Sequence, residues 1–357
     1  MAPLVACLLA GGVVADRVSR RTVMVVADVV RLVSQGAMAA LLVTGAAELW
    51  MLGALAGLTG AATGFFNPAS TGLLPAVVSA ERLQQANALR GLAMACGEIA
   101  GPVVAGALVA TVGAGWALGV DALTFAASAA FLVRLRVPAR AGRAARSFLG
   151  DLRDGWEAFR SRTWVWTFVA SAAAGNMLFA SWNVLGPVVA DRELGGAATW
   201  GLIVGALGAG SLVGGFVALH ARPARPLLVA TLAVSIFALP LAALALGLPA
   251  PAIAAVTFLS GAGLMLSNTV WESTLQRHIP PESLSRVSAY DWFGSMAFSP
   301  LGFALWGPLA GAIGVDRALW LAFALQIVSV LALLAVRDIR RLPPFPEPSR
   351  AAVGGGG

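Results

Sequence analysis

Glu98 is the acidic residue whose position in this 357-residue sequence most favours chemistry. It lies about eleven residues into an apolar run, or roughly 16 Å along a helix, with no Arg or Lys close to it on that helix. A lone carboxyl group at such a depth is costly to ionise, so it could load and unload a proton near neutral pH. The alternative is a permanently protonated acid that is hydrogen-bonded within a helix bundle.

Asp28 and Arg31 form a second candidate pair for proton chemistry. They are three residues apart on one helical face, roughly 8 to 14 Å into an apolar run. Ionisable groups at that depth face the protein interior, because exposure to lipid is costly. Two interpretations stay open: a structural ion pair that links helices, or a direct role in binding protons or substrate.

Asn176 and Asn183 are candidates for binding a small molecule. They are seven residues apart and therefore lie on nearly the same helical face, with Phe179 and Trp182 nearby. Amides and aromatic rings in this arrangement could line a cavity for cargo. Hydrogen bonding between neighbouring helices is the alternative use of the amides.

Glu272 and Asp291 flank a short gap between two apolar runs, and Arg277 and Arg286 lie in that gap. We expect structural ion pairs across the gap rather than proton coupling.

Covalent catalysis is disfavoured by what the sequence lacks. Its two histidines, His220 and His278, fall in gaps between apolar runs, and no nucleophile motif with a matching base lies inside a run. The two cysteines, Cys7 and Cys96, lie in apolar runs and offer no metal site, and the absence of Lys excludes a Walker-type phosphate loop. We therefore expect no catalytic residue, metal or cofactor.

The elements that position these residues are membrane-spanning helices. The chain is 59% hydrophobic and 11% charged, with a mean hydropathy of +0.83, which excludes a water-soluble domain. About eleven apolar runs are long enough to be helices of an all-α membrane protein, although the first is short and resembles the tail of a helix. They cover residues 2–15, 23–45, 48–66, 87–112, 115–135, 164–190, 199–219, 227–247, 250–272, 287–311 and 316–336.

The arginines predict the orientation of these helices. Of the 24 arginines, 21 lie in alternate gaps and in the C-terminal tail. The positive-inside rule therefore places those gaps and the C-terminus in the cytoplasm, in a multi-pass protein of the inner (plasma) membrane. Arginines spread over short gaps do not form the single basic face that nucleic acid requires, so the expected partner is the lipid bilayer and no obligate protein partner is evident.

An internal repeat divides the chain into two halves. A shift of 201 residues aligns Thr59-Gly60-Ala61 with Ser260-Gly261-Ala262, and Asn67 with Asn268. The aligned segments fall on the same side of the membrane, which predicts two parallel bundles around a central cavity. We expect an incomplete five-helix bundle in residues 1–135, a cytoplasmic linker in 136–163, a six-helix bundle in 164–336 and a disordered cytoplasmic tail in 337–357. A six-helix repeat further predicts one more helix before residue 1.

The first gap carries the residues of a family signature: Gly12, Asp16, Arg17, Arg20 and Arg21. This spacing resembles the GxxxDRxxRR signature between the second and third helices of the major facilitator superfamily. Asp28-x-x-Arg31, Ala86-Asn87-Ala88 and Thr274-Leu275-Gln276 resemble the macrolide-efflux and enterobactin-exporter-like branch. The sequence departs from the family in the absent first helix, and the corresponding second-half loop, Ala218–Arg222, has no acid.

The resemblance implies a secondary transporter of the drug:proton antiporter type. Such a protein alternates between two open states and exports a small amphipathic molecule, of drug, macrolide or siderophore type, in exchange for protons. The signature residues then form a cytoplasmic gate, where Asp16 can bond to arginines or helix ends in one conformation and release them in the other. Asp121 fits the family pattern as a residue that braces helices. A uniporter or importer on the same fold, or an inactive truncated transporter, is the alternative.

Overall fold

The computed structural model describes residues 2–137 and 148–343, and within these ranges every element is a helix. The first part of the chain forms five α-helices with one short 3-10 turn before the fourth. They are α1 (Ala2–Arg17), α2 (Arg20–Thr44), α3 (Leu49–Val77), η1 (Ala80–Arg82), α4 (Leu83–Val112) and α5 (Ala114–Arg134). We call these helices the N bundle.

The second part begins with α6 (Phe148–Arg160), a helix of the linker that lies outside the apolar runs. The helices that follow form the C bundle. They are α7 (Thr163–Glu193), α8 (Ala197–His220), α9 (Pro226–Ser235), η2 (Ile236–Ala238), α10 (Leu239–Ala245), α11 (Ala250–His278), α12 (Pro281–Met296), α13 (Ser299–Ile313), α14 (Val315–Ala335) and α15 (Arg337–Arg341).

The all-α membrane fold predicted from the apolar runs is confirmed. Ten stretches within the described residues are long and apolar enough to cross a membrane, and they match all the expected runs except the first. The first, α1, has only 16 residues. Most of these helices therefore begin and end in the charged gaps between the apolar runs, as the sequence predicts.

The tail departs from its prediction near its start. Arg337–Arg341 form the helix α15, and Ile339 is fully buried in the core of the C bundle rather than disordered. An isoleucine in this position gains burial when the chain turns back onto the bundle. Residues 344–357 lie outside the described residues.

The repeat is visible in the helix boundaries. A shift of 201 residues carries α3 onto α11, the η1–α4 segment onto the α12–α13 segment, and α5 onto α14. Gly113 and Gly314, which precede α5 and α14, share a backbone φ of 91°. Glycine is favoured there because an L side chain is strained at positive φ. The two halves thus repeat their turns as well as their helices.

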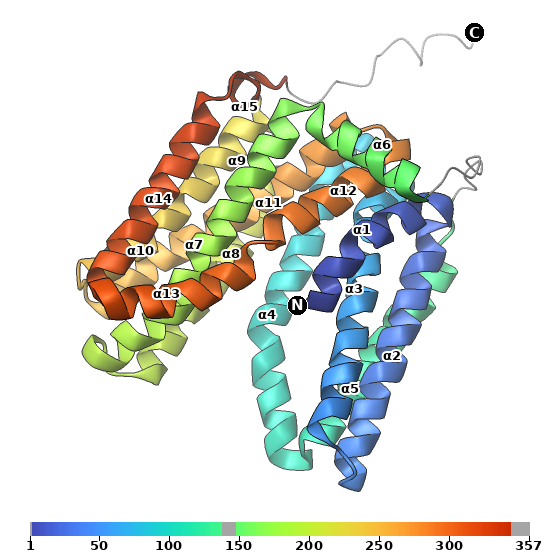
Figure 1. The fold of residues 1–357 in the computed structure, drawn as a ribbon, viewed down its shortest axis with the longest axis horizontal. Helices are drawn as coiled ribbons and strands as arrows, with labels where there is room; N and C mark the ends of the chain where they lie inside the picture. The colour runs from blue at the N-terminus through green and yellow to red at the C-terminus, as the bar shows by residue number, and fades with distance from the viewer. Residues whose placement is uncertain (1, 138–147, 344–357) are drawn as a thin grey trace.

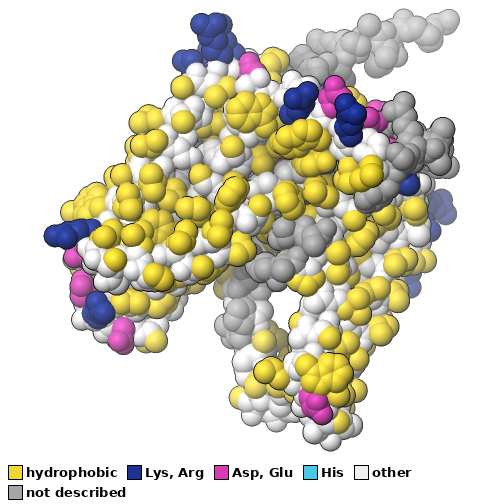
Figure 2. Space-filling view, viewed as in Figure 1, with side chains coloured by type: hydrophobic (Ala, Val, Ile, Leu, Met, Phe, Trp, Pro, Cys, Tyr) yellow, Lys and Arg dark blue, Asp and Glu magenta, His cyan; other side chains and the backbone are white. Residues whose placement is uncertain are grey.

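The two bundles meet from one end of the molecule to about the middle of α4 and α8. Figure 1 shows α6, the end of α1 and the start of α12 together at one end, which we call the linker end. At the opposite end, the far end, Figure 2 shows the bundles separated by a deep notch. Helix pairs that join the bundles include α1–α12, α3–α12, α3–α11, α4–α8 and α4–α11. The fold therefore has a sealed end and an open end.

Candidate functional site

The sealed end is built where α1 crosses α12. A Cβ atom added at Gly12 would lie 2.5 Å from the Cβ of Ala289 and 2.9 Å from the carbonyl oxygen of Ser285. Because no side chain fits in this space, glycine lets the two helices touch. The close approach brings the charged end of α1 over the first turns of α12.

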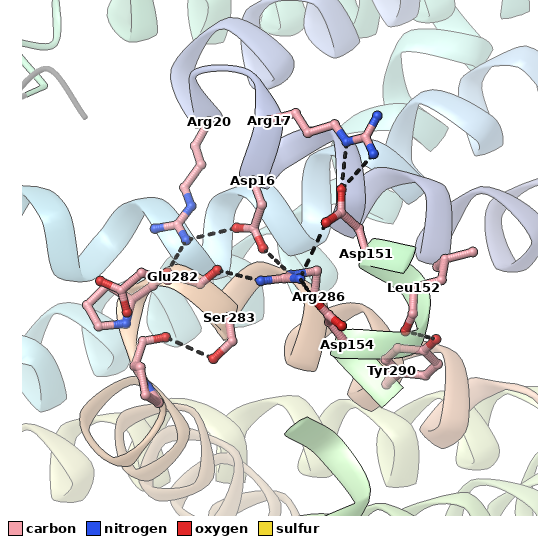
Figure 3. A network of polar contacts seen from close by, with 12 residues as sticks. Asp16, Arg17, Arg20, Asp151, Leu152, Asp154, Glu282, Ser283, Arg286 and Tyr290 are labelled. Carbon is pink, nitrogen blue, oxygen red and sulfur yellow. Dashed lines mark hydrogen bonds and ion pairs between the residues drawn. The ribbon is translucent and has the colours of Figure 1, made fainter. Parts of the chain in front are cut away.

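Asp16 is the carboxylate at the centre of this contact (Figure 3). Its Oδ2 accepts a hydrogen bond of 2.9 Å from Arg286 Nε, and its Oδ1 lies 3.3 Å from Arg20 Nη2. All three side chains are more than nine-tenths buried. Burial raises the pKa of the Asp16 carboxyl, and the two arginines oppose that rise. The ionised form of Asp16 therefore depends on both arginines, one from each bundle.

Arg20 adds backbone contacts on both sides of the interface. It donates to the carbonyl oxygen of Gly72 in α3 and, at 2.7 Å, to that of Pro281 at the start of α12. Arg21 instead donates 2.9 Å to the carbonyl oxygen of Leu135, within the N bundle. The structure thus separates the paired arginines of the signature: Arg20 joins the bundles and Arg21 does not.

The linker helix α6 closes over this contact. Asp151 forms an ion pair of 2.7 Å with Arg17 and lies 3.8 Å from Arg286. Asp154 lies 4.0 Å from Arg286, and Tyr290 of α12 donates 2.9 Å to the carbonyl oxygen of Leu152. From the sequence, this amphipathic stretch is predicted only to be part of the linker. Its paired acids, one turn apart, were the signal that it binds arginines.

We call Asp16, Arg17, Arg20, Asp151 and Arg286 the gate. A second set of contacts between the bundles, which we call the seam, is uncharged. Asn87 of α4 donates to Ser273 Oγ at 3.0 Å and to Gln276 Oε1 at 2.8 Å, both on α11. Gln84 donates 2.9 Å to the carbonyl oxygen of Ala218 in α8. Side-chain amides suit this position because each can bond to groups on the opposite bundle without a net charge.

Asp28 and Arg31 form an ion pair of 2.8 Å inside the N bundle. Ser128 of α5 donates 2.7 Å to Asp28, and the Arg31 guanidinium lies 4.2 Å from the ring centre of Phe66 in α3. Asp121 of α5 also interacts electrostatically with Arg31. These contacts tie α2 to α3 and α5, and a role of Asp28 and Arg31 in binding protons or substrate stays a prediction.

The position of Glu98 in α4 is known, but its side chain lies outside the described residues. Its neighbour Ile99 packs against α8, since a Cβ added at Gly208 would lie 2.6 Å from Ile99 Cγ1. Backbone position 98 is therefore next to a contact between the bundles.

The four cargo-binding candidates on α7 fall into two groups. Asn176 and Asn183 are exposed; they donate to the carbonyl oxygens of Ser295 at 2.9 Å and of Phe179 at 3.3 Å. Trp182 is 4% exposed and belongs to the core of the C bundle, with its ring 4.7 Å from that of Trp200. The ring of Phe179 lies 4.8 Å from that of Phe237. Trp182 therefore faces away from the amides, because neighbouring positions on a helix point about 100° apart.

The ion pairs expected between Glu272 or Asp291 and the gap arginines are not what the structure contains. Arg286 bonds to Asp16 in the gate, and Arg277 interacts electrostatically with Glu81. Asp291 accepts a hydrogen bond of 3.1 Å from Trp271 Nε1 and interacts electrostatically with Glu272. The two acids therefore interact with each other electrostatically, and no ion pair between either acid and Arg277 or Arg286 is found among the described residues.

Comparison with known proteins agrees with this architecture. The sequence pattern of the Major Facilitator Superfamily matches residues 1–302. The enterobactin exporter EntS of Salmonella typhimurium is 28% identical over 373 residues, which cover 96% of this chain and 83% of that protein. The EntS protein of Escherichia coli O157:H7 is 27% identical over 362 residues, covering 97% of this chain and 84% of the relative.

Solved structures share the fold at lower identity. A bacterial homologue of the iron transporter ferroportin in an outward-facing state has a TM-score of 0.73 and 17% identity, covering 94% of this chain and 87% of that one. The human organic anion transporter MFSD10 has a TM-score of 0.74 and 17% identity, covering 93% and 81%. The family match spans most of the chain and agrees with its ten apolar helices, so this protein belongs to the Major Facilitator Superfamily and is a multi-pass membrane transporter.

Proposed function

We propose that this transporter exports a small amphipathic molecule, of drug, macrolide or siderophore type, in exchange for protons. The observation that carries the proposal is the sealed linker end opposite an open far end. Alternating access requires one end of a central cavity to close while the other opens. The arginine-rich gaps support a cytoplasmic linker end, which makes this conformation outward-open in an inner (plasma) membrane with a cytoplasmic C-terminus.

The gate and the seam supply the contacts that such a cycle must break. Arg286 and Asp16 come from different bundles and are buried together, so separating the bundles removes their hydrogen bond. Asn87 and Gln276 form the equivalent contact in the seam. In the inward-open state all four side chains become accessible to water, which can replace these bonds.

The relatives support siderophore-type cargo, because both are named as enterobactin exporters. Two exposed amides on α7, Asn176 and Asn183, are our candidates for contacting the cargo. Amides can bond to the several carbonyl and hydroxyl groups that such molecules present. Glu98 is our candidate for coupling within the N bundle, because its backbone position adjoins a contact between the bundles.

The test uses the full-length protein in proteoliposomes with an imposed pH gradient, and enterobactin as the probe. We expect enterobactin to move against its gradient while protons move the other way, and this movement to stop when a protonophore collapses the gradient. Glu98→Gln should remove the proton dependence. Asp316→Asn, at the start of α14, is the control, because this acid lies in the first helical turn and outside both the gate and the seam.

Two results would overturn the proposal. Transport at the same rate with and without the pH gradient indicates a uniporter, and counterflow of labelled enterobactin would then persist without any gradient. Failure to bind or move enterobactin, macrolides and cationic dyes alike would overturn the cargo class.

A further inference from the structure

Glu272 of α11 and Asp291 of α12, which we call the pair, are two acids on helices of the C bundle; Asp291 is buried and Glu272 is half-buried. The side chain of Asp291 is buried, with 7% of its surface exposed. Its Oδ2 accepts from Trp271 Nε1 at 3.1 Å, and its Oδ1 lies 3.5 Å from Ser295 Oγ. Glu272 interacts electrostatically with it. Two neighbouring carboxylates in such surroundings repel each other, so they do not both ionise without a cation or a proton.

One oxygen of this pair is shielded and lacks a partner. Glu272 Oε2 has almost no exposed surface and no hydrogen-bond partner among the described residues. A buried carboxylate oxygen is normally hydrogen-bonded, because the loss of its hydration is costly. A proton on this oxygen removes its charge and turns it from an acceptor without a partner into a hydrogen-bond donor.

The cation that faces the pair comes from the other bundle. Arg90 of α4 interacts electrostatically with Glu272 across the interface. It lies one turn beyond Asn87, which bonds to Ser273 and Gln276, so Arg90 follows the same face of α4 as the seam. A Cβ added at Gly91 would lie 2.6 Å from Met265 Sδ of α11, which shows how closely the two helices approach.

The other helices around the pair bring no further charge to this depth. Among the described residues α3, α9 and α10 carry no charged side chain, α8 has only His220 at its end, and the charges of α7 lie in its last turn. The remaining charges on α1, α6, α11 and α12 belong to the linker end. They are Asp16, Arg17, Asp151, Arg153, Asp154, Glu157, Arg160, Arg277, His278, Glu282 and Arg286. Arg90 is therefore the cation whose distance from the pair changes when the bundles separate.

We propose that Glu272 and Asp291 form a proton-binding site governed by Arg90 of the other bundle. This inference rests on the proposed exchange of cargo for protons and assigns a second proton site, in the C bundle, in addition to the candidate Glu98 in the N bundle. With the linker end sealed, Arg90 stabilises an ionised carboxylate, and that attraction adds to the seam. A proton that binds to the pair removes the attraction, so protonation favours the state in which α4 and α11 separate.

This order of events fits an exporter. A proton that enters from the far end weakens the seam and allows the linker end to open. Cargo then binds from the linker side, and the proton leaves to the more alkaline compartment. The ionised pair attracts Arg90 again as the linker end closes. The only bonds made and broken in this sequence are those of the proton, which passes from water to a carboxylate oxygen and back to water.

The first measurement detects the bound proton directly. Infrared difference spectra of the purified protein, taken across a pH titration, report the carbonyl stretch of protonated carboxyl groups. The spectra are taken in a Glu98→Gln background, because Glu98 is the other candidate for binding the proton. We expect a titrating band in this background that is lost in both Glu272→Gln and Asp291→Asn. Asp121→Asn is the matched control, because Asp121 is a partly buried acid beside its own cation, Arg31. A band that survives in both pair variants would overturn the proposal.

The second measurement follows the linker end. Spin labels at Arg134→Cys and Arg222→Cys, which are exposed at the linker ends of α5 and α8, report the separation of the bundles. Burial in the sealed state raises the pKa of Asp16, so acidification favours the sealed state through that residue. This effect is opposite to the one expected from Glu272 and Asp291. The titration is therefore done in an Asp16→Asn background. We expect acidification to shift the ratio of open to sealed protein roughly tenfold.

In this background, Glu272→Gln and Arg90→Gln should each favour the open form at every pH and remove its increase on acidification, because each removes one partner of the attraction. Asp291→Asn leaves Glu272 ionised beside Arg90 and should favour the sealed form instead. An unchanged pH dependence in the three variants would refute the site, as would a response to Na⁺ at constant pH. Neither measurement uses cargo. If both succeed and enterobactin transport ignores the pH gradient, the proton site stands and the proposed exchange fails. If transport is proton-driven and both measurements fail, the exchange stands and the site is wrong.

Discussion

Arg286→Gln is the change that should disturb the gate most. Removing one partner of a buried ion pair leaves the other charge uncompensated and typically costs about 3 to 5 kcal/mol. Asp16 keeps Arg20, whose Nη2 lies 3.3 Å from Oδ1, so we expect a smaller loss of about 2 to 3 kcal/mol from the sealed state. The ratio of sealed to open protein should therefore fall roughly 30- to 160-fold.

The reverse change should matter less. In Asp16→Asn the guanidinium of Arg286 keeps two acids of α6, with Asp151 at 3.8 Å and Asp154 at 4.0 Å. The asparagine oxygen can still accept from Arg286 Nε, so we expect a loss of about 1 kcal/mol. Because Asp16→Asn also removes the uncompensated acid of Arg286→Gln, the double variant should recover most of the sealed population. The two substitutions are therefore expected to be strongly non-additive.

The assay is the distance between spin labels at Arg134→Cys and Arg222→Cys. The background carries Cys7→Ala and Cys96→Ala, which removes both native thiols. All four proteins of the cycle are measured at one pH in the same lipid. Additive effects of the two substitutions, or a larger effect from Asp16→Asn than from Arg286→Gln, would refute the assignment of Asp16 and Arg286 as one coupled contact.

Three further predictions concern residues around the gate and in the N bundle. Arg17→Gln should cost the sealed state less than about 1 kcal/mol in the same distance assay, because the Arg17 side chain is 37% exposed. Gly12→Ala should destabilise the sealed state by about 1 to 3 kcal/mol, because the added methyl group clashes with α12. Gly36→Ala should leave the sealed state unchanged, because no atom lies within 4 Å of the added methyl group. Equal effects of the two substitutions would contradict the packing argument. Asp28→Asn should lower the thermal unfolding temperature, because it removes the direct ion pair of the buried Arg31 and leaves only the electrostatic interaction with Asp121. An unchanged temperature would contradict the bracing role.

Much of the scaffold could be predicted from the sequence, because the lipid environment imposes simple rules. The apolar runs and the charged gaps between them predict ten of the membrane-spanning segments. The shift of 201 residues aligns the helix boundaries of the two halves. The repeat was detectable because glycines such as Gly113 and Gly314 are required where the backbone adopts a positive φ. A requirement set by the backbone at one position can be recognised from the residue type at that same position.

The partners of the charged residues could not be predicted in the same way. Arg286 and Asp16 are 270 residues apart, and nothing local to either residue identifies the other. Arg286 was expected to neutralise Glu272 or Asp291, but α12 directs it toward α1 and α6. The sequence predicts that Trp182 and Asn183 line the same cavity, because they are neighbours in the chain. Neighbouring side chains on a helix point about 100° apart, so the two residues face different surroundings. Tertiary arrangement decided each of these cases.

The repeat makes the two halves of the bundle interface geometrically equivalent but chemically different. A shift of 201 residues carries the α1–α12 contact onto the α8–α4 contact, and Arg286 onto Gln85. One side is closed by a buried charged hydrogen bond, and the other by neutral amides such as Gln84 and Asn87. Neutral hydrogen bonds contribute about 0.5 to 1.5 kcal/mol each, and bonds to charged groups about 1.5 to 3. A single substitution in the charged side should therefore shift the conformational equilibrium further than one in the amide side, although the two sides occupy equivalent positions in the fold.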